Sequence, residues 1–277
     1  KMLAREEAVS KDEDIEDVHQ MRVATRRLRA ALQTVEGVFE PDIIRRYRKG
    51  LRRIAQSLGA VRDGDVFLEH LHTHRDTLPE DERPALDTLI ATVTTERANA
   101  RRALLDDLAS KRYRAFKREF GEFLSTPGAG ALPPPEPGVT QRVRDFAGSA
   151  IWRRYELWRA YETVLPNGDD ATLHQARIAG KRFRYTLEFF AEVLGERVDT
   201  VLDPLIALQE CLGDLQDGVT AREHMAALGL ADDAGAQAYL ATRTGERAPK
   251  LAELPRLWDR VDRGTYRRRL FELIVKM

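Results

Sequence analysis

The chain has little of what several common classes of protein require. Among its 277 residues there is a single cysteine, Cys211, which excludes an intramolecular disulfide framework and suits a reducing compartment. No apolar run approaches the length of a membrane-spanning helix, and no secretory signal peptide is recognisable. Lysine plus arginine equals aspartate plus glutamate at 45 each, so net charge alone does not indicate a nucleic-acid partner. We therefore expect a cytoplasmic protein with no membrane partner.

Signals for β-strands are also nearly absent. The sequence has few runs of β-branched residues and no Asn-Gly hairpin turn, whereas apolar residues recur at helical spacing throughout. We predict an all-α fold. One stretch rich in proline and glycine, residues 125–138, reads as a linker and contains Pro133, Pro134 and Pro135. The predicted organisation is a first helical repeat over 1–124, this linker, and a second helical repeat over 139–277.

One short pattern occurs twice and indicates the internal repeat. Residues 19–29 read HQMRVATRRLR, and residues 174–184 read HQARIAGKRFR. Both copies begin with His-Gln and place basic residues at the third, seventh, eighth and tenth positions after the histidine. On a helix with about 100° per residue, the histidine and three of these cations share one face. The two stripes are His19, Arg22, Arg26 and Arg29, and His174, Arg177, Lys181 and Arg184, with Arg27 and Arg182 as secondary candidates.

The lack of acidic residues within each stripe is its unusual property. No aspartate or glutamate lies between Asp17 and Glu36, or between Asp170 and Glu188. A run of charge is most often a solvated helix face, but such faces usually mix signs so that neighbouring turns attract. Four like charges on adjacent turns repel one another, and here the arrangement occurs twice in the same phase. We therefore predict that an anion binds to both stripes.

The doubled motif resembles that of the conserved histidine α-helical domain, or CHAD, family. The family's hallmark is similar to His-x-x-Arg-x-x-x-(Arg/Lys)-(Arg/Lys)-x-Arg in each of two helical repeats, and both copies here match at every named position. The resemblance implies two pseudo-twofold-related four-helix bundles around a basic central channel. It also implies that this channel binds inorganic polyphosphate.

The two halves differ in the helix that follows each motif. In the first half, Arg45, Arg48, Lys49 and Arg52 share one face of a helix expected near 42–58. Aligned on the pairs Leu58-Gly59 and Leu212-Gly213, their counterparts are Asp199, Leu202, Asp203 and Ile206. We expect a polyanion to bind more strongly to the first half. We also predict that both Leu-Gly pairs form turns, with Asp63 and Asp217 capping the helices that follow.

Three functions are compared on the sequence. The favoured one is a polyphosphate-binding module, which could target the protein to polyphosphate granules. Nucleic-acid binding is the alternative, although base recognition needs several stacking aromatics and only Tyr185 lies close to a stripe. An enzyme acting on phosphate chains is less favoured, because there is no His-Asp dipeptide, no paired carboxylates near the stripes and no Glu-x-Glu-x-Lys motif. We expect no catalytic residues and no cofactor.

A metal site is likewise not expected. His70, His72 and His74 lie close together, but no cysteine or carboxylate set accompanies them, so the end of a surface helix is the better interpretation. A metal role for Asp63 or Asp65 is the less favoured alternative to a structural one.

Overall fold

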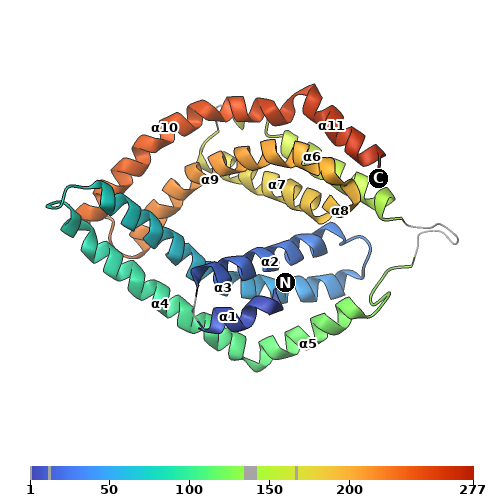
Figure 1. The fold of residues 1–277 in the computed structure, drawn as a ribbon, viewed down its shortest axis with the longest axis horizontal. Coiled ribbons are helices and arrows are strands. Elements are labelled where there is room, and N and C mark those ends of the chain that lie inside the picture. Colours follow the sequence, from blue (N-terminus) through green and yellow to red (C-terminus); the bar gives the residue numbers. More distant parts are fainter. Residues whose placement is uncertain (1, 12–13, 134–141, 166–167) are drawn as a thin grey trace. The chain divides into compact units, whose positions relative to one another are not determined.

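The structure is a computed structural model that describes residues 2–11, 14–133, 142–165 and 168–277. These residues form a series of helices (Figure 1). Within the described ranges, the only paired extended backbone is an isolated antiparallel bridge between Phe39 and Ala131. The predicted all-α fold is therefore confirmed. Residues 134–138 of the predicted linker lie outside the described ranges.

The chain divides into two compact units. The first comprises Lys1–Pro133 together with Asp232–Tyr239, and the second comprises Pro134–Ala231 and Leu240–Met277. The predicted second repeat included 232–239, which the structure groups with the first unit. The contacts of Tyr239 give the reason, since its ring lies 5.9 Å from that of Phe67 and 5.4 Å from that of His74.

The first unit is built on one long helix. This helix, α3 (Pro41–Thr77), packs against α2 (Ile15–Thr34) and α4 (Asp87–Ala109). Its fully buried Leu51, Ile54 and Leu58 form a core with Met21 of α2 and Leu104 of α4. The helices of the unit are α1 (Glu6–Lys11), α2 (Ile15–Thr34), α3 (Pro41–Thr77), α4 (Asp87–Ala109) and α5 (Lys111–Ser125), with 3-10 turns at Leu3–Arg5 and Arg83–Leu86.

The second unit has a core rich in aromatic side chains. Trp158 is fully buried, and its ring packs against those of Phe183 at 5.8 Å and Trp258 at 4.6 Å. The motif helix α7 packs against α6 and α9. The elements are α6 (Val143–Arg159), α7 (Asp170–Phe189), α8 (Ala191–Leu194), a 3-10 turn (Glu196–Val198), α9 (Asp199–Ala227), α10 (Ala234–Asp262) and α11 (Gly264–Val275).

Both motif helices begin at the capping residues that the sequence indicates. The side chain of Asp14 accepts a hydrogen bond from the backbone N–H of Glu16 at 2.8 Å, and that of Asp169 accepts one from Thr172 at 2.8 Å. Each cap satisfies a backbone donor that would otherwise have no partner in the first turn. His19 and His174 consequently lie in the second turn of their helices.

The predicted turns at the Leu-Gly pairs are wrong. Residues 58–63 lie inside α3, and residues 212–217 lie inside α9, so Asp63 and Asp217 cap nothing. A glycine inside a helix costs only about 1 kcal/mol relative to alanine, which the packing of a long helix readily offsets. Gly59 and Gly213 each lie beside a motif arginine, as described below.

Gly180 is explained by close approach of neighbouring helices, as its place beside the apolar face indicates. A Cβ atom at this position would lie 2.8 Å from Trp158 Nε1 and closer still to Gln209 Nε2. The corresponding residue of the first motif is the fully buried Thr25. In the second repeat, the space beside this position is therefore filled by the indole of Trp158 and the buried amide of Gln209. In the first repeat, the equivalent position carries the side chain of Thr25.

We expect Gly180→Ala to lower the free energy of unfolding. Overpacking a core costs about 1–3 kcal/mol, which exceeds the gain in helix propensity of up to about 1 kcal/mol. Gly245→Ala in α10 is the matched control, because a Cβ there meets nothing within 4 Å. That control should be neutral or slightly stabilising. Urea unfolding of both variants measures the difference, and equal effects at the two sites would contradict the packing argument.

Candidate polyanion-binding site

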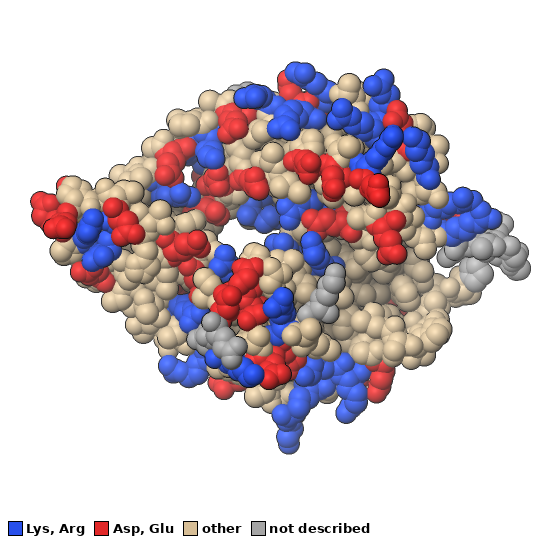
Figure 2. Space-filling model, in the orientation of Figure 1, with Lys and Arg blue, Asp and Glu red and all other residues tan. Residues whose placement is uncertain are grey.

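The two stripes occupy equivalent positions in their units. Each lies along the boundary between its motif helix and a neighbouring helix. All eight stripe residues are partly buried, whereas the neighbouring Arg27 and Arg182 are exposed. A solvated charged face would leave long cationic side chains exposed, as on the outer surface, where acidic and basic side chains are mixed (Figure 2). The stripes are thus held at helix–helix boundaries, where like charges are more costly to keep together.

In the first unit, Arg29 lies in a cluster with two arginines of α3. Burial lowers the pKa of Arg29, and the charges of Arg52 and Arg48 lower it further. Arg48 also pairs with Glu36 at 3.2 Å. Within the described part of the chain, no carboxylate forms an ion pair with Arg29 or Arg52. Three guanidinium groups therefore share one carboxylate, and the cluster is short of negative charge.

The middle of the stripe is fixed by Arg22. Its Nη2 forms an ion pair with Asp63 Oδ1 at 3.3 Å, which joins α2 to α3. A Cβ atom at Gly59 would make an ordinary van der Waals contact with Arg22 Nε at 3.7 Å, so this position of α3 lies directly beside the guanidinium.

The end of the stripe nearest the start of α2 contains a cation that the sequence analysis missed. Burial lowers the pKa of His19; Glu16 opposes this effect, and Arg62, Arg26 and Arg22 add to it. Arg62 belongs to α3, three residues beyond Gly59, and is partly buried. Once α3 is known to be continuous, this spacing places Arg62 on the same side of the helix as Gly59.

The second unit repeats this geometry with a different chemistry. A Cβ atom at Gly213 would lie 3.9 Å from Arg177 Nε, which matches the relation of Gly59 to Arg22. His174 donates a hydrogen bond from Nδ1 to Gln216 Oε1 at 2.8 Å. Gln216 corresponds to Arg62, so a neutral amide replaces a cation beside the histidine.

Arg184, predicted to bind the anion, already has an acidic partner. Its Nε lies 3.2 Å from Glu188 Oε1, one turn later on α7, and its Cζ lies 5.2 Å from the centre of the Tyr185 ring. The residue corresponding to Glu188 in the first repeat is the neutral Gln33. Tyr185 is only 8% exposed, so its ring is not available to stack on a base.

The four predicted cations of α3 fall into two groups. Arg48 and Arg52 face Arg29, whereas Arg45 pairs with Asp42 in its own helix at 2.9 Å and Lys49 is exposed. Their counterparts on α9 add no positive charge: Leu202 is buried, Ile206 is partly buried, and Asp199 and Asp203 are acidic.

The carboxylates beside the site serve as partners of cations. Asp65 is buried and forms an ion pair with Arg97 at 2.8 Å, so its role is structural. Within the described residues, no group of three or more histidine, cysteine, aspartate or glutamate side chains is placed to hold a metal ion. This applies to His70, His72 and His74, which lie in the last turns of α3.

These features define an all-helical protein in which a stripe of cationic side chains along a helix–helix boundary occurs twice. The CHAD domain family model matches residues 1–226, and the chain belongs to this family. Two curated proteins of Mycobacterium tuberculosis, uncharacterized protein Rv2226 (strain H37Rv) and uncharacterized protein MT2285 (strain CDC 1551), are each 30% identical to it over 216 residues. The match covers 75% of this chain and 39% of each relative, so the chain spans about two fifths of their length.

Solved structures confirm the fold. The crystal structure of the CHAD domain from the plant Ricinus communis superposes with a TM-score of 0.68 at 28% identity, covering 98% of this chain and 86% of that one. PptA from Streptomyces chartreusis superposes with a TM-score of 0.69 at 19% identity, covering 93% and 96% respectively, which shows the fold alone. None of the helices in the described part combines the length and apolar character that crossing a bilayer requires.

Proposed function

We propose that this protein binds inorganic polyphosphate without transforming it, and that the basic border between α2 and α3 is the stronger of two contact surfaces. The observation that supports this most directly is the cluster of Arg29, Arg48 and Arg52. It holds three partly or fully exposed guanidiniums with one carboxylate between them. A bound polyanion supplies the negative charge that the fold itself lacks.

The shape of the surface favours a linear anion over a single phosphate. From His19 to Arg29 the stripe follows α2 for about 15 Å, at 1.5 Å per residue. Arginine binds phosphate oxygens through paired N–H donors, and a chain with a charge on every unit can contact successive turns. The second unit has its own contact surface, which Arg177 and Lys181 provide and to which Arg184 contributes less because Glu188 is its partner.

The pairing of the nearby carboxylates supports the proposal of binding without catalysis. Asp63 is paired with Arg22, and Glu36 is paired with Arg48, so neither is poised as a general base. We propose that the role of the binding is to bring the protein to polyphosphate granules. Incubation with polyphosphate, with and without Mg²⁺, should release no orthophosphate.

Nucleic acid shares the phosphate backbone and is the alternative ligand. The protein should bind labelled polyphosphate in preference, because Tyr185 is buried and the described stripes have no other stacking ring beside them. Competition with unlabelled polyphosphate, single-stranded DNA and single-stranded RNA, at equal phosphate concentration and one salt concentration, separates the two. Displacement by nucleic acid as effective as that by polyphosphate would replace the proposed ligand.

A further inference from the structure

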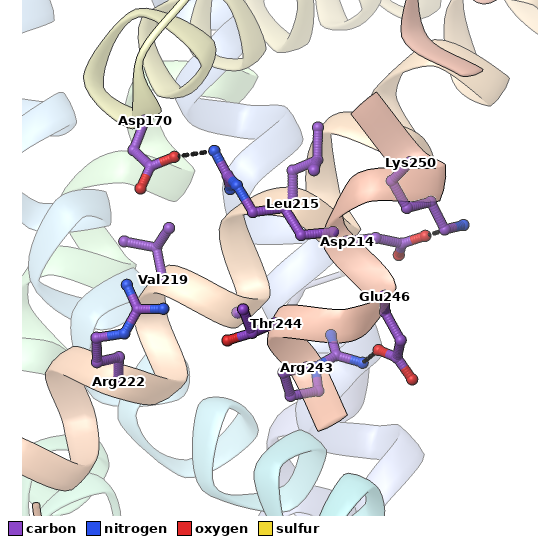
Figure 3. Close-up of a pocket in the computed structure, with 11 residues that line it drawn as sticks. Asp170, Asp214, Leu215, Val219, Arg222, Arg243, Thr244, Glu246 and Lys250 are labelled. Atoms are coloured by element: carbon purple, nitrogen blue, oxygen red, sulfur yellow. Dashed lines mark hydrogen bonds and ion pairs between the residues drawn. The ribbon is translucent and has the colours of Figure 1, made fainter. Parts of the chain in front are cut away.

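The second unit contains a cavity outside the stripes. It lies between the first residue of α7, the middle of α9 and the middle of α10, and its volume is about 380 Å³ (Figure 3). This volume is within the range of small-molecule sites in proteins. His174, Arg177, Lys181 and Arg184 do not line the cavity, so it is separate from the proposed polyphosphate surface.

The cavity's carboxylates are all engaged by cations. Asp170 pairs with Arg247, Asp214 pairs with Lys250 at 2.5 Å, and Glu246 pairs with Arg243 at 2.6 Å. Pairing with Asp214 raises the pKa of Lys250, which therefore stays charged at neutral pH. The three ion pairs cancel in charge; those of Arg247 and Lys250 join α10 to α7 and α9, and that of Arg243 lies within α10.

One further cation leaves the cavity with a net positive charge. Arg222 of α9 also lines it, and within the described residues this guanidinium has no ion pair. Figure 3 shows Arg222 on the α9 wall and Arg243 on the α10 wall. An arginine has five N–H donors, so Arg243 and Arg247 keep donors after pairing. The cavity thus offers many donors and few free acceptors, which selects a ligand with several acceptor oxygens.

The remaining wall is apolar. Leu215 and Val219 lie on the same side of α9, and Gly218 between them adds no side chain. An inorganic anion would leave this wall in contact with water, whereas a compact organic group would cover it. We propose that this cavity binds a small organic phosphate, with the phosphoryl oxygens on Arg222 and Arg243 and the organic part against Leu215 and Val219. This site does not depend on polyphosphate binding at the stripes.

Calorimetric titration of the whole protein with adenosine monophosphate tests the proposal, with orthophosphate as the comparison. The nucleotide should bind more tightly than orthophosphate. Arg222→Glu should weaken nucleotide binding by about tenfold or more, because it replaces an unpaired donor group by a like charge. Arg256→Glu, an exposed substitution on α10 outside the cavity, is the matched control and should leave the affinity within about twofold.

A second substitution has the opposite expected sign. Asp214→Asn removes the partner of Lys250 and adds one net positive charge to the cavity, so nucleotide binding should strengthen several-fold. General damage to the fold would weaken binding in both variants. Wild-type affinity in Arg222→Glu, or weaker binding in Asp214→Asn, overturns the proposal. So does an equal loss of nucleotide and long-chain polyphosphate binding in Arg222→Glu, which would make the cavity a part of the polyphosphate surface.

Discussion

Charge reversal at Arg29 should weaken polyphosphate binding far more than charge reversal at the equivalent Arg184. Arg29 lies beside Arg48 and Arg52 and has no acidic partner among the residues that the structure describes, whereas Arg184 is already paired with Glu188. Hydrogen bonds to charged groups contribute about 1.5–3 kcal/mol each when they are partly shielded from water. We expect Arg29→Glu to raise the dissociation constant by roughly 10- to 150-fold, and Arg184→Glu to raise it only a few-fold.

Stability should change in the opposite direction. Replacing Arg29 by a neutral or acidic residue removes repulsion within the cluster, so the free energy of unfolding without ligand should stay the same or rise. Binding isotherms and urea unfolding of the same variants measure both effects. Equal losses of affinity from Arg29→Glu and Arg184→Glu would contradict the proposed asymmetry. Weaker binding together with a destabilised fold would instead show that Arg29 is structural.

Lower pH should strengthen polyphosphate binding, and the two motif histidines should account for the change. A nearby anion favours the imidazolium form, so the bound protein holds more protons than the free one and affinity increases as pH falls. In the free protein the pKa of His19 is below its usual value of about 6.5, because of burial and the charges of Arg62, Arg26 and Arg22. The gain in affinity should therefore begin as pH falls through the pKa of the bound state and continue below pH 6.5.

The double variant His19→Gln and His174→Gln should lose most of this pH response. Each histidine contributes up to about tenfold in affinity for every pH unit between its free and bound pKa values. His19 also has a consequence for stability: charging it is unfavourable in the folded state, so the free protein should lose stability as pH falls through 6.5, and His19→Gln should reduce that loss. A pH response that persists in the double variant would exclude both histidines from the site.

The repeat, the helices that hold it and their caps could be predicted from the sequence. The doubled motif has the helical period, and Asp14 and Asp169 stand where a cap is needed. The continuity of α3 and α9 could not be predicted in the same way. A glycine beside a leucine is compatible with a turn or with a helix interior, and the structure shows the helix interior in both units.

The composition of the site was only partly predictable for the same reason. Arg62 lies beyond the predicted turn, so its contact with the His19 end of the stripe appears only when α3 is one helix. The pairing of Arg184 with Glu188 has the sequence spacing of an ion pair on a helix, and that spacing was the available signal. The choice of Arg48 and Arg52 over Arg45 and Lys49 depends on which face of α3 meets α2, which requires the structure.

The salt dependence of polyphosphate binding tests the central claim most directly. Dissociation constants for long-chain polyphosphate would be measured from low to moderate salt for the wild type and for the triple variant Arg29→Gln, Arg48→Gln and Arg52→Gln, with orthophosphate as the comparison ligand. Counterion release predicts a steep linear fall of log affinity with log salt concentration, a slope clearly smaller in the triple variant, and far weaker binding of orthophosphate. An unchanged slope and affinity in the triple variant, or equal affinity for orthophosphate, would contradict the assignment of this cluster as the polyanion-binding surface.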